Sequence, residues 1–357
     1  MDIHNLKIIQ KNFINELTSA NKNHKSSLPF IRHKLTTTSI VNDGEIFQTM
    51  VIGGSVYQKA LMKKTDGKIE MISHLEGPQP QFSSKQILLE FLQEHVDPEV
   101  GVVALNFAYP MKPTNRDGVP DGTLVNGSKE NTFDGLVGQR VGEEIEKFFK
   151  KNHDRDIKIS AANDTICLLL SGLTKHAWDK LAAGVVGTGL NFAIFLDMDT
   201  VVNLESAEFD KFTQSEAGKI IDQASNALGS ALFEKEVSGA YLYHHFNIEA
   251  KKRGLSVDKI TNTKAIDDYA INSNAQIAHL AREILAQSAM LVTAQVSGIL
   301  EFCGRDLTFI MQGSLFWKGK NYKDTVEKNV TELSPKYRAT FEKIEHSDLY
   351  GAAKLVA

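Results

Sequence analysis

Three glycine-centred turns, each preceded by a β-branched or apolar run, most constrain the fold of this chain. They are Gly53-Gly54-Ser55, Gly187-Thr188-Gly189 and Gly313-Ser314. Glycine tolerates backbone conformations and close approaches that other residues resist, so a strand can end sharply at each turn. Backbone N–H groups at such turns can also approach phosphate oxygens, and Ser or Thr adds a hydroxyl donor. A single turn of this kind is usually only a turn, so a phosphate-binding role depends on what surrounds it.

Strand-like and helix-like segments alternate along the chain, which predicts an α/β fold. Strands are expected at 46–52, 57–62, 68–73, 102–107, 157–160, 192–196, 200–203, 307–311 and 339–345, with a glycine-rich turn at 184–189. Helices are expected where apolar residues recur every three or four positions, at 135–151, 277–300 and 322–333. The last residues, 351–357, are too few to stand alone and are expected to dock on another element.

The N-terminal segment carries Leu6, Ile9, Phe13 and Leu17 at helical spacing. Two structures fit this stripe: a helix docked on its own domain and a membrane-anchoring helix. We favour the docked helix, because the stripe is narrow and the opposite face is mixed rather than strongly basic. No run approaches 18 consecutive apolar residues, and the first 24 residues contain no uninterrupted apolar block. Neither a membrane span nor a secretory signal is therefore expected.

Composition narrows the class of protein. The length of 357 residues suggests two domains or one large one. The net charge, 40 basic minus 44 acidic residues, is −4, which does not suggest a nucleic-acid partner. The two cysteines, Cys167 and Cys303, lie far apart in the sequence, which excludes a disulfide framework and a cysteine-based zinc cluster. Two free thiols fit a reducing compartment, so we expect a cytoplasmic protein.

Further short motifs lie between and after the glycine turns. In chain order they are Leu28-Pro29-Phe30, Leu105-Asn106-Phe107-Ala108-Tyr109-Pro110, Val125-Asn126-Gly127-Ser128-Lys129, Ala161-Ala162-Asn163-Asp164-Thr165, Val202-Asn203-Leu204-Glu205, Leu232-Phe233-Glu234-Lys235, Ser238-Gly239-Ala240-Tyr241-Leu242 and Gly351-Ala352-Ala353. The whole series resembles the hexokinase family of sugar kinases, within the actin-like ATPase superfamily. The resemblance implies a two-lobed α/β fold with an interlobe cleft. The small lobe would hold 45–160 and 346–357, the large lobe 1–44 and 161–345, and the lobes would close on the sugar.

The resemblance also implies a role for each matching residue. Asp164 matches the catalytic base, which accepts the proton of the sugar 6-hydroxyl as it attacks the γ-phosphate of ATP. Ser128 and Lys129 match a Thr-Lys pair that holds the sugar, and Lys129 adds positive charge near the reacting centre. The remaining implied sugar ligands, whose amides and carboxylates suit a ring of hydroxyls, are Asn163, Asn191, Glu205 and Glu234. The implied nucleotide contacts are the three glycine turns, Gly53, Gly54 and Ser55, then Gly187, Thr188 and Gly189, then Gly313 and Ser314.

The first glycine turn departs from the family pattern. The family usually has Asp-x-Gly-Gly-Thr there, and that Asp orients Mg²⁺ through water, whereas this chain has Val51 at the Asp position. Gln58 stands near an expected Arg, Gln312 replaces an Asp before the third turn, and Ala108 replaces a sugar-binding Ser. The sugar side of the site is therefore better preserved than the nucleotide side.

These departures leave two functions open. The first is ATP-dependent phosphorylation of a hexose such as glucose, in which Asp164 is the base and also orients Mg²⁺ indirectly. The second is a hexose-binding or regulatory protein of the same fold with little or no catalysis. Retention of Asp164, Lys129 and Thr188 together favours the kinase, because a binding protein has no obvious need for the last two.

Each of these residues also has an ordinary structural interpretation. Asn163 and Asp164 could cap a helix, since Asn and Asp accept hydrogen bonds from helix N–H groups. Surface, turn or helix roles are equally available to Lys129, Glu205 and Glu234. The ordered set favours the sugar site over these alternatives. The adjacent His244 and His245 are expected to be structural, because neighbouring helix side chains point about 100° apart and share a metal poorly.

Overall fold

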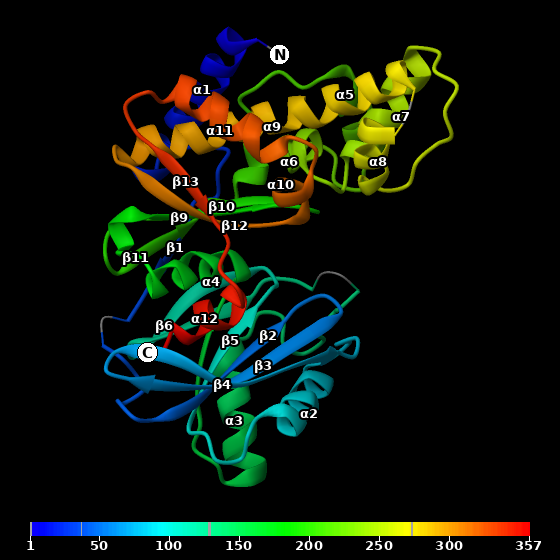
Figure 1. Cartoon of the computed structure of the whole chain (residues 1–357). Coiled ribbons are helices and arrows are strands. Elements are labelled where there is room, and N and C mark those ends of the chain that lie inside the picture. The colour runs from blue at the N-terminus through cyan, green and yellow to red at the C-terminus, as the bar shows by residue number, and fades with distance from the viewer. Residues whose placement is uncertain (1, 37, 128–129, 273) are drawn as a thin grey trace. The chain divides into compact units, whose positions relative to one another are not determined.

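The computed structural model describes residues 2–36, 38–127, 130–272 and 274–357. The chain forms two compact units (Figure 1). Unit 1 comprises Met1–Phe30, Gly184–Phe192 and Leu204–Glu342, and unit 2 comprises Ile31–Ala183, Ala193–Asn203 and Lys343–Ala357. These bounds differ from the predicted lobes, because 31–44 and 161–183 belong to the same unit as 45–160. The lobe division, which concerns closure on a sugar, stays a prediction.

In the described part of the chain the β-structure consists of two main sheets and a separate hairpin, and their alternation with helices confirms the predicted α/β class. The six-stranded sheet has the order β1 (Ile31–Lys34), β11 (Thr200–Asn203), β10 (Leu190–Phe195), β9 (Leu181–Val186), β12 (Leu307–Gln312) and β13 (Ala339–Glu342). The five-stranded sheet has the order β4 (Lys68–Pro78), β3 (Val56–Thr65), β2 (Ile46–Ile52), β5 (Val102–Phe107) and β8 (Lys158–Ala162). In the second sheet β2, β5 and β8 are parallel, so their carboxyl ends meet at one edge.

Unit 1 is built around one long helix. The helices of this unit are α1 (Ile3–Asn21), α5 (Glu216–Ala224), α6 (Leu232–Val237), α7 (Leu242–Lys252), α8 (Lys264–Asn272), α9 (Ala275–Cys303), α10 (Ser314–Lys318) and α11 (Tyr322–Leu333). Helix α1 packs on α9, where a Cβ at Gly298 would lie 2.8 Å from the Phe13 ring. All four residues of the N-terminal stripe are buried, so the docked helix is confirmed. By length and composition α9 could cross a membrane, but 78% of its apolar window is buried inside the protein, as expected for a core helix.

In unit 2, helices pack on the five-stranded sheet. They are α2 (Lys85–His95), α3 (Val141–His153), α4 (Asp164–Ser171) and α12 (Ser347–Ala353), with short 3₁₀ turns at Gly172–Thr174 and Trp178–Lys180. Residues of α2 and α3 share one apolar cluster with Met50, Ile52, Leu105 and Phe107 of the sheet. Helix α12, red in Figure 1, contacts β2, β5 and α4. The prediction that the C-terminal residues dock on another element is therefore confirmed.

Among the predicted boundaries that were wrong, the strand expected over 339–345 ends at Glu342, and two others involve glycine. The helix expected over 135–151 begins only at Val141, because Gly135 and Gly138 adopt φ of 83° and 81°, which end regular structure before it. Val137 is consequently exposed rather than buried. The turn expected over 184–189 is shorter, because Gly184 lies inside β9, where a Cβ would lie 2.5 Å from the Phe192 ring. The first error arises from extending a helix through two glycines of positive φ, and the second from treating a buried strand glycine as part of a turn.

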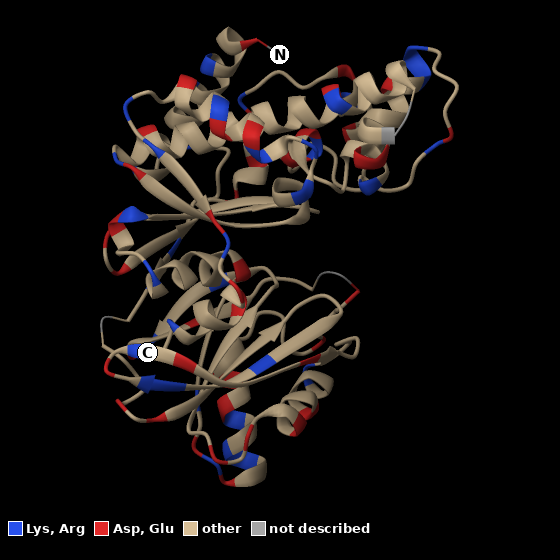
Figure 2. Ribbon diagram, viewed as in Figure 1, with Lys and Arg blue, Asp and Glu red and all other residues tan. Residues whose placement is uncertain are grey.

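Helix α3 of unit 2 has acidic residues at its beginning and basic residues at its end. Its first turn contains Glu143 and Glu144, and its last turn contains Lys150, Lys151 and His153 (Figure 2). This order places acids near the positive end of the helix dipole and bases near its negative end. The basic run at the end of α3 is thus a solvated helix end, as its exposed lysines indicate.

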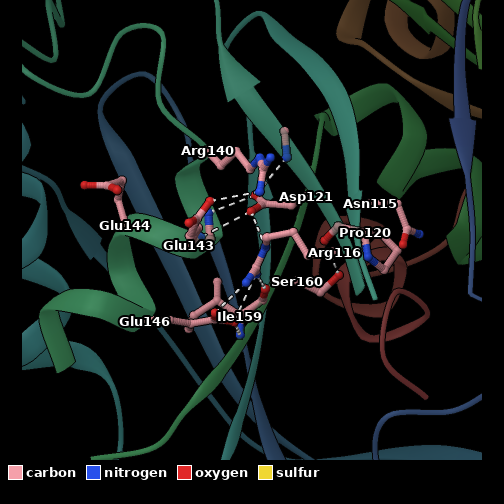
Figure 3. Close-up of polar contacts among 12 residues, drawn as sticks. Asn115, Arg116, Pro120, Asp121, Arg140, Glu143, Glu144, Glu146, Ile159 and Ser160 are labelled. Atoms are coloured by element: carbon pink, nitrogen blue, oxygen red, sulfur yellow. Dashed lines mark hydrogen bonds and ion pairs between the residues drawn. The ribbon is translucent and has the colours of Figure 1, made fainter. Parts of the chain in front are cut away.

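A buried carboxylate ties a hairpin that the sequence did not predict to α3 and β8. The hairpin consists of β6 (Met111–Arg116) and β7 (Val119–Leu124). Asp121 of β7 accepts hydrogen bonds from the backbone N–H groups of Gly142 and Glu143, and so caps α3 from outside (Figure 3). Arg116 pairs with Asp121 at 2.8 Å and donates to the Ile159 carbonyl oxygen of β8 at 2.8 Å. This network holds β8 in place just before Asn163 and Asp164.

Candidate functional site

Glu234 in unit 1 lies against the beginning of β10. Its Oε2 accepts a hydrogen bond of 2.9 Å from the backbone N–H of Leu190, and a Cβ at Gly189 would lie 3.1 Å from the same oxygen. Burial raises the pKa of the Glu234 carboxyl, opposed by the Leu190 N–H and Lys235, while Glu208 raises it further. One carboxylate oxygen is thus anchored, which orients the group as an acceptor for a ligand hydroxyl.

Asn191 and Glu205 lie at the same place in unit 1. The Asn191 Oδ1 accepts hydrogen bonds from Phe192 N–H at 2.8 Å and from Ser206 N–H at 3.3 Å. Ser206 directly follows Glu205, whose left-handed backbone, φ 49°, opens the 3₁₀ helix Ser206–Glu208. That 3₁₀ helix contacts α6, which carries Glu234. Three predicted sugar ligands from distant parts of the sequence therefore gather around Leu190 and Asn191.

The second and third glycine turns of unit 1 pack backbone against backbone. A Cβ at Gly187 would lie 3.0 Å from the Cα of Gly313, and a Cβ at Gly313 would lie 2.1 Å from the Val186 carbonyl oxygen. A third segment joins them, since the Gly239 N–H donates to the Gly187 carbonyl oxygen at 2.7 Å. Thr188 and Ser314 are exposed beside this contact. Side chains are thus excluded from a region where backbone and hydroxyl groups can meet phosphate oxygens, which fits a bound nucleotide.

In unit 2, Asn163 and Asp164 follow the carboxyl end of β8 and open α4. Asn163 is the N-cap residue: its Oδ1 accepts from Thr165 N–H at 3.0 Å and from the Asn203 Nδ2 at 3.5 Å. The capping interpretation is therefore correct for Asn163, and the group that it can offer to a sugar is its amide nitrogen. The Asp164 Oδ1 accepts from Thr165 N–H at 2.8 Å. Asp164 is partly exposed, so its carboxylate is accessible to a ligand.

The first glycine turn joins β2 to β3 in unit 2. The Gly53 carbonyl oxygen accepts hydrogen bonds from the Tyr109 hydroxyl and from the Gln79 Nε2. Gly54 and Ser55 are exposed at the tip of the turn. Val51, which stands where the family has a carboxylate, is buried at 8% exposure and pairs in register with Gln58 on β3. An aliphatic side chain in this position has no atom that could hold a metal or its water.

Not every predicted site residue can be placed. Ser128 and Lys129 lie outside the residues that the structure describes. His245, expected to be structural, is buried, and its Nε2 lies 2.7 Å from the Lys235 carbonyl oxygen. Among the described residues, no group of three or more His, Cys, Asp or Glu side chains lies together as a metal cluster would. A Mg²⁺ ion is usually held by one or two carboxylates, waters and substrate phosphates, so such a cluster is not needed here.

Sequence reasoning assigned no role to two polar residues at the end of β5 and the start of α12. Asn106 of β5 is completely buried, and its Nδ2 lies 3.5 Å from both the carbonyl oxygen and the Oδ1 of Asp348. Asn106 stands in a motif already quoted, and Asp348 lies three positions before Gly351-Ala352-Ala353. The signal that could have identified them was the polarity of Asn106 inside an otherwise apolar strand.

Comparison with curated proteins finds hexokinases that are similar over much of the chain. A family model for hexokinase matches residues 243–357. Rice (Oryza sativa subsp. japonica) hexokinase-7 is 21% identical, over 65% of this chain and 62% of its own length. Tobacco (Nicotiana tabacum) hexokinase-1 is 24% identical, over 71% of this chain and 64% of its own length. The match thus spans just under two thirds of these relatives. Potato (Solanum tuberosum) hexokinase-2 is 22% identical over 88% of this chain.

Solved structures show the same fold. A hexokinase from Schistosoma mansoni complexed with glucose aligns with a TM-score of 0.75 at 20% identity, covering 100% of this chain and 95% of that one. A second hexokinase crystal structure aligns with a TM-score of 0.80 at 17% identity, covering 100% and 96%. A ROK hexokinase from Thermus thermophilus aligns with a TM-score of 0.59 at 14% identity, covering 87% and 98%. These likenesses confirm the predicted α/β fold of the actin-like ATPase type.

Proposed function

We propose, from the premise that this chain belongs to the hexokinase family, that it transfers the γ-phosphoryl group of ATP to the 6-hydroxyl of a hexose, glucose foremost. The observation that carries the proposal is the gathering of Asn191, Glu205 and Glu234 around the start of β10. Oriented carboxylates and amides satisfy a ring of hydroxyls that both donate and accept. A site built in this way rejects ligands that lack a hydroxyl.

In the proposed reaction Asp164 is the general base. Its carboxylate takes the proton of the 6-hydroxyl, so that the oxygen can attack the γ-phosphorus in line with the leaving group. Asn163 positions the sugar through its amide nitrogen, because its oxygen caps α4. Ser128 and Lys129 keep the roles that the family resemblance implies. Charge neutralisation by Lys129 would lower the cost of bringing an alkoxide toward a phosphate.

The proposed cofactors are ATP and Mg²⁺. When bound, Mg²⁺ would neutralise the charge that develops on the phosphates. The chain's own contribution is the close-packed backbone at Gly187, Gly239 and Gly313, with the exposed hydroxyls of Thr188 and Ser314 beside it. The exposed tip of the first turn, Gly54 and Ser55, is the third proposed phosphate contact.

A hexose-binding protein without turnover is the second candidate. Val51 favours it, because a buried aliphatic side chain stands where the family orients its metal. The two candidates share the sugar ligands of unit 1 and differ in what happens at the phosphate. The second candidate therefore predicts hexose binding that ATP and Mg²⁺ do not convert into product.

One pair of measurements tests both. A coupled phosphorylation assay over a panel of hexoses, with ATP and either Mg²⁺ or Mn²⁺, should detect sugar phosphate, with glucose among the best substrates. In parallel, a hexose should raise the melting temperature, since a ligand that binds only the folded state stabilises it by mass action. A rise in melting temperature without product would select the second candidate. No rise with any hexose at millimolar concentration, and no product, would reject both.

We also propose a cytoplasmic location. Cys167 is buried and Cys303 half-buried, and both are free thiols. Burial raises the pKa of the Cys303 thiol to about 11, which keeps it protonated and unreactive at neutral pH. Such thiols are compatible with a reducing compartment. Fractionation of cells followed by detection of the tagged protein would test the location directly.

A further inference from the structure

Asp348 lies against the end of β5 in unit 2. It stands in the first turn of α12, and that helix contacts β2, β5 and α4. The Asp348 Oδ1 and carbonyl oxygen each lie 3.5 Å from the Asn106 Nδ2. Asn106 is the penultimate residue of β5, so this carboxylate sits at the carboxyl end of the strand.

The strand register places Val51 beside the same carboxylate. Val51 of β2, Asn106 of β5 and Ala162 of β8 are in register across three parallel strands. Side chains in register point to one face of a sheet, and their neighbours point to the other. Ile52, Phe107 and Ala161 lie in the apolar cluster with α2 and α3, so Val51 and Asn106 face α12. Asp348 therefore covers the face on which a carboxylate at position 51 would project.

The oxygen of the Asn106 amide has no hydrogen-bond donor within the described part of the chain. Its side chain is completely buried, and among the described residues its Oδ1 accepts no hydrogen bond. A buried amide oxygen without a partner is costly, and few such atoms persist in folded proteins without a reason. If Asn106 served only to hold α12 against the sheet, the contact of its Nδ2 with Asp348 would be explained. The burial of its Oδ1 without a donor would not be. A hydrated cation would satisfy the oxygen, either directly or through the hydrogen of a bound water.

Asp164 is close to the same place. The pKa of the Cys167 thiol, which lies on α4, is raised well above its usual value by burial, and further by the charges of Asp348 and Asp164. The strand register agrees, since Asp164 opens α4 two residues after Ala162, which is in register with Asn106. Helix α12 approaches α4 closely at this point, since a Cβ at Gly351 would lie 1.8 Å from the Cys167 carbonyl oxygen.

We propose that Asp348, together with the Asn106 Oδ1, orients the Mg²⁺ of the nucleotide complex and so supplies the carboxylate that Val51 lacks. The proposal rests on the proposed kinase function. Mg²⁺ takes one or two carboxylates alongside phosphate oxygens and waters, and Asp348 and Asp164 provide that number at one end of the sheet. In this arrangement the metal-orienting carboxylate comes from the start of α12 and not from the end of β2, where the family pattern has it. Both positions lie at the same edge of the five-stranded sheet.

Metal-dependent nucleotide binding tests the proposal without turnover. The probe is a non-hydrolysable ATP analogue, titrated by calorimetry in Mg²⁺ or in EDTA, with Mn²⁺ electron paramagnetic resonance reporting the bound metal. Asp348→Asn keeps the shape and removes the charge, so the gain in affinity that the metal gives should fall by about tenfold or more. Binding in EDTA should not change. The matched control is Asp154→Asn, which removes an exposed carboxylate before the opposite, amino end of β8.

A second test moves the carboxylate from position 348 to position 51, so that the conclusion does not depend on Asp348→Asn alone. Val51→Asp alone would set a second carboxylate beside Asp348, so it should lower the melting temperature and add little affinity. Val51→Asp combined with Asp348→Ser should regain most of the metal-dependent affinity that Asp348→Ser loses. The double variant thus tests coupling between position 51, in register with Asn106, and position 348, which Asn106 contacts. It also decides the case if Asp348→Asn does not fold.

The outcomes separate this proposal from the kinase proposal. Metal-dependent affinity that survives in both Asp348→Asn and Asp348→Ser would overturn the role of Asp348, whether or not the wild type phosphorylates hexoses. So would a wild type whose nucleotide affinity is the same in Mg²⁺ and in EDTA. The variants could lose metal-dependent affinity while the wild type forms no sugar phosphate. That combination would support the role of Asp348 and reject the kinase function.

Discussion

In unit 1 a methyl group added at Gly313 would lie 2.1 Å from the Val186 carbonyl oxygen, whereas in unit 2 one added at Gly53 would approach only the Val56 carbonyl oxygen, at 3.4 Å. The backbone differs too, since Gly313 has φ of 107° and Gly53 is not among the positive-φ glycines. Glycine at 313 is thus required by packing and conformation, and glycine at 53 by neither. A glycine in one of these motifs therefore indicates a structural requirement at position 313 and a much weaker one at position 53.

The polar groups of the two regions differ in the same way. In unit 1, Glu234 and Asn191 are each held by backbone N–H groups, so their oxygens have defined positions. At the sheet edge of unit 2, the first turn has an exposed tip and the carboxylates come from two helices, Asp164 on α4 and Asp348 on α12. On this contrast we propose that unit 1 carries the hexose ligands Asn191, Glu205 and Glu234 and that unit 2 carries the general base, and the following changes test features of both units.

The largest effect is expected for Asp164→Asn in unit 2. Asparagine keeps the shape and the contact with Thr165 but cannot accept the proton, and loss of a general base typically costs about 10²–10⁴-fold in kcat. Hexose binding should survive, because the ligands of unit 1 are untouched. Steady-state kinetics and calorimetry with the same hexose measure the two quantities. Near wild-type turnover would remove Asp164 from the mechanism, and lost hexose affinity would show that its carboxylate also contributes to hexose binding.

Gly313→Ala should strongly destabilise unit 1. The new Cβ would overlap backbone atoms of Val186 and Gly187, and alanine is strained at φ of 107°. Overpacking and a disfavoured backbone each cost about 1–3 kcal/mol, so the free energy of unfolding should fall by about 3 kcal/mol or more. Chemical denaturation monitored by circular dichroism measures it. A variant as stable as the wild type would mean that the turns of unit 1 can separate at little cost, and their close packing would no longer distinguish them.

Much of the fold could be predicted from the sequence because it depends on local patterns. The strands at 46–52, 102–107 and 200–203 and the helix at 322–333 appear with the expected bounds, since hydrophobic periodicity and turn residues determine them. The hairpin β6–β7 was missed, because what holds it is the buried Asp121, which bonds to α3 some 20 positions later. A carboxylate that caps a distant helix leaves no periodic trace in its own strand.

The candidate site was predictable only where a motif carries its own geometry. The order of motifs brought Asn191, Glu205 and Glu234 into one list, and the structure gathers them through Leu190 and Ser206, contacts that no motif specifies. Asp348 could not be found in this way, because it lies 242 positions from Asn106 and its helix docks by packing of Gly351 against Cys167. Where a short helix docks on a distant part of the chain depends on the complementary shapes of the two surfaces. A single sequence does not reveal those shapes.

Hexose affinity should depend on pH through Glu234 of unit 1. Burial raises the pKa of this carboxyl above its ordinary value of 4.5, and hydroxyl binding favours the ionised form. Affinity should therefore decline on acidification before pH 4.5 is reached, by about tenfold or more, since a hydrogen bond to a charged group contributes about 1.5–3 kcal/mol. The folded protein takes up this proton more readily than the unfolded chain does. The group's contribution to stability is thus complete below 4.5 and is lost as pH rises through the raised pKa.

Two variants identify the titrating group. Glu234→Gln should bind more weakly at neutral pH and lose this part of the pH dependence. Glu208→Gln removes a charge that raises the pKa of Glu234, so the decline should move to lower pH. Calorimetric titrations with glucose at several pH values give both curves. A Glu234→Gln protein with the wild-type pH profile would show that another group titrates, and that the ligands of unit 1 are not oriented as described.

The smallest effect is expected for Gly53→Ala in unit 2. The nearest atom to the new Cβ is the Val56 carbonyl oxygen at 3.4 Å, which is ordinary contact, and φ at Gly53 is not in the left-handed region. Alanine also restricts the unfolded chain, which stabilises compatible sites by about 0.4–1 kcal/mol. The melting temperature should therefore stay the same or rise slightly, in direct contrast to Gly313→Ala under the same conditions. A Gly53→Ala protein that unfolds as early as the Gly313 variant would show that the first turn is packed as tightly as those of unit 1. Its exposed tip would then be held by contacts with Tyr109 and Gln79 that tolerate no displacement of the Gly53 carbonyl group.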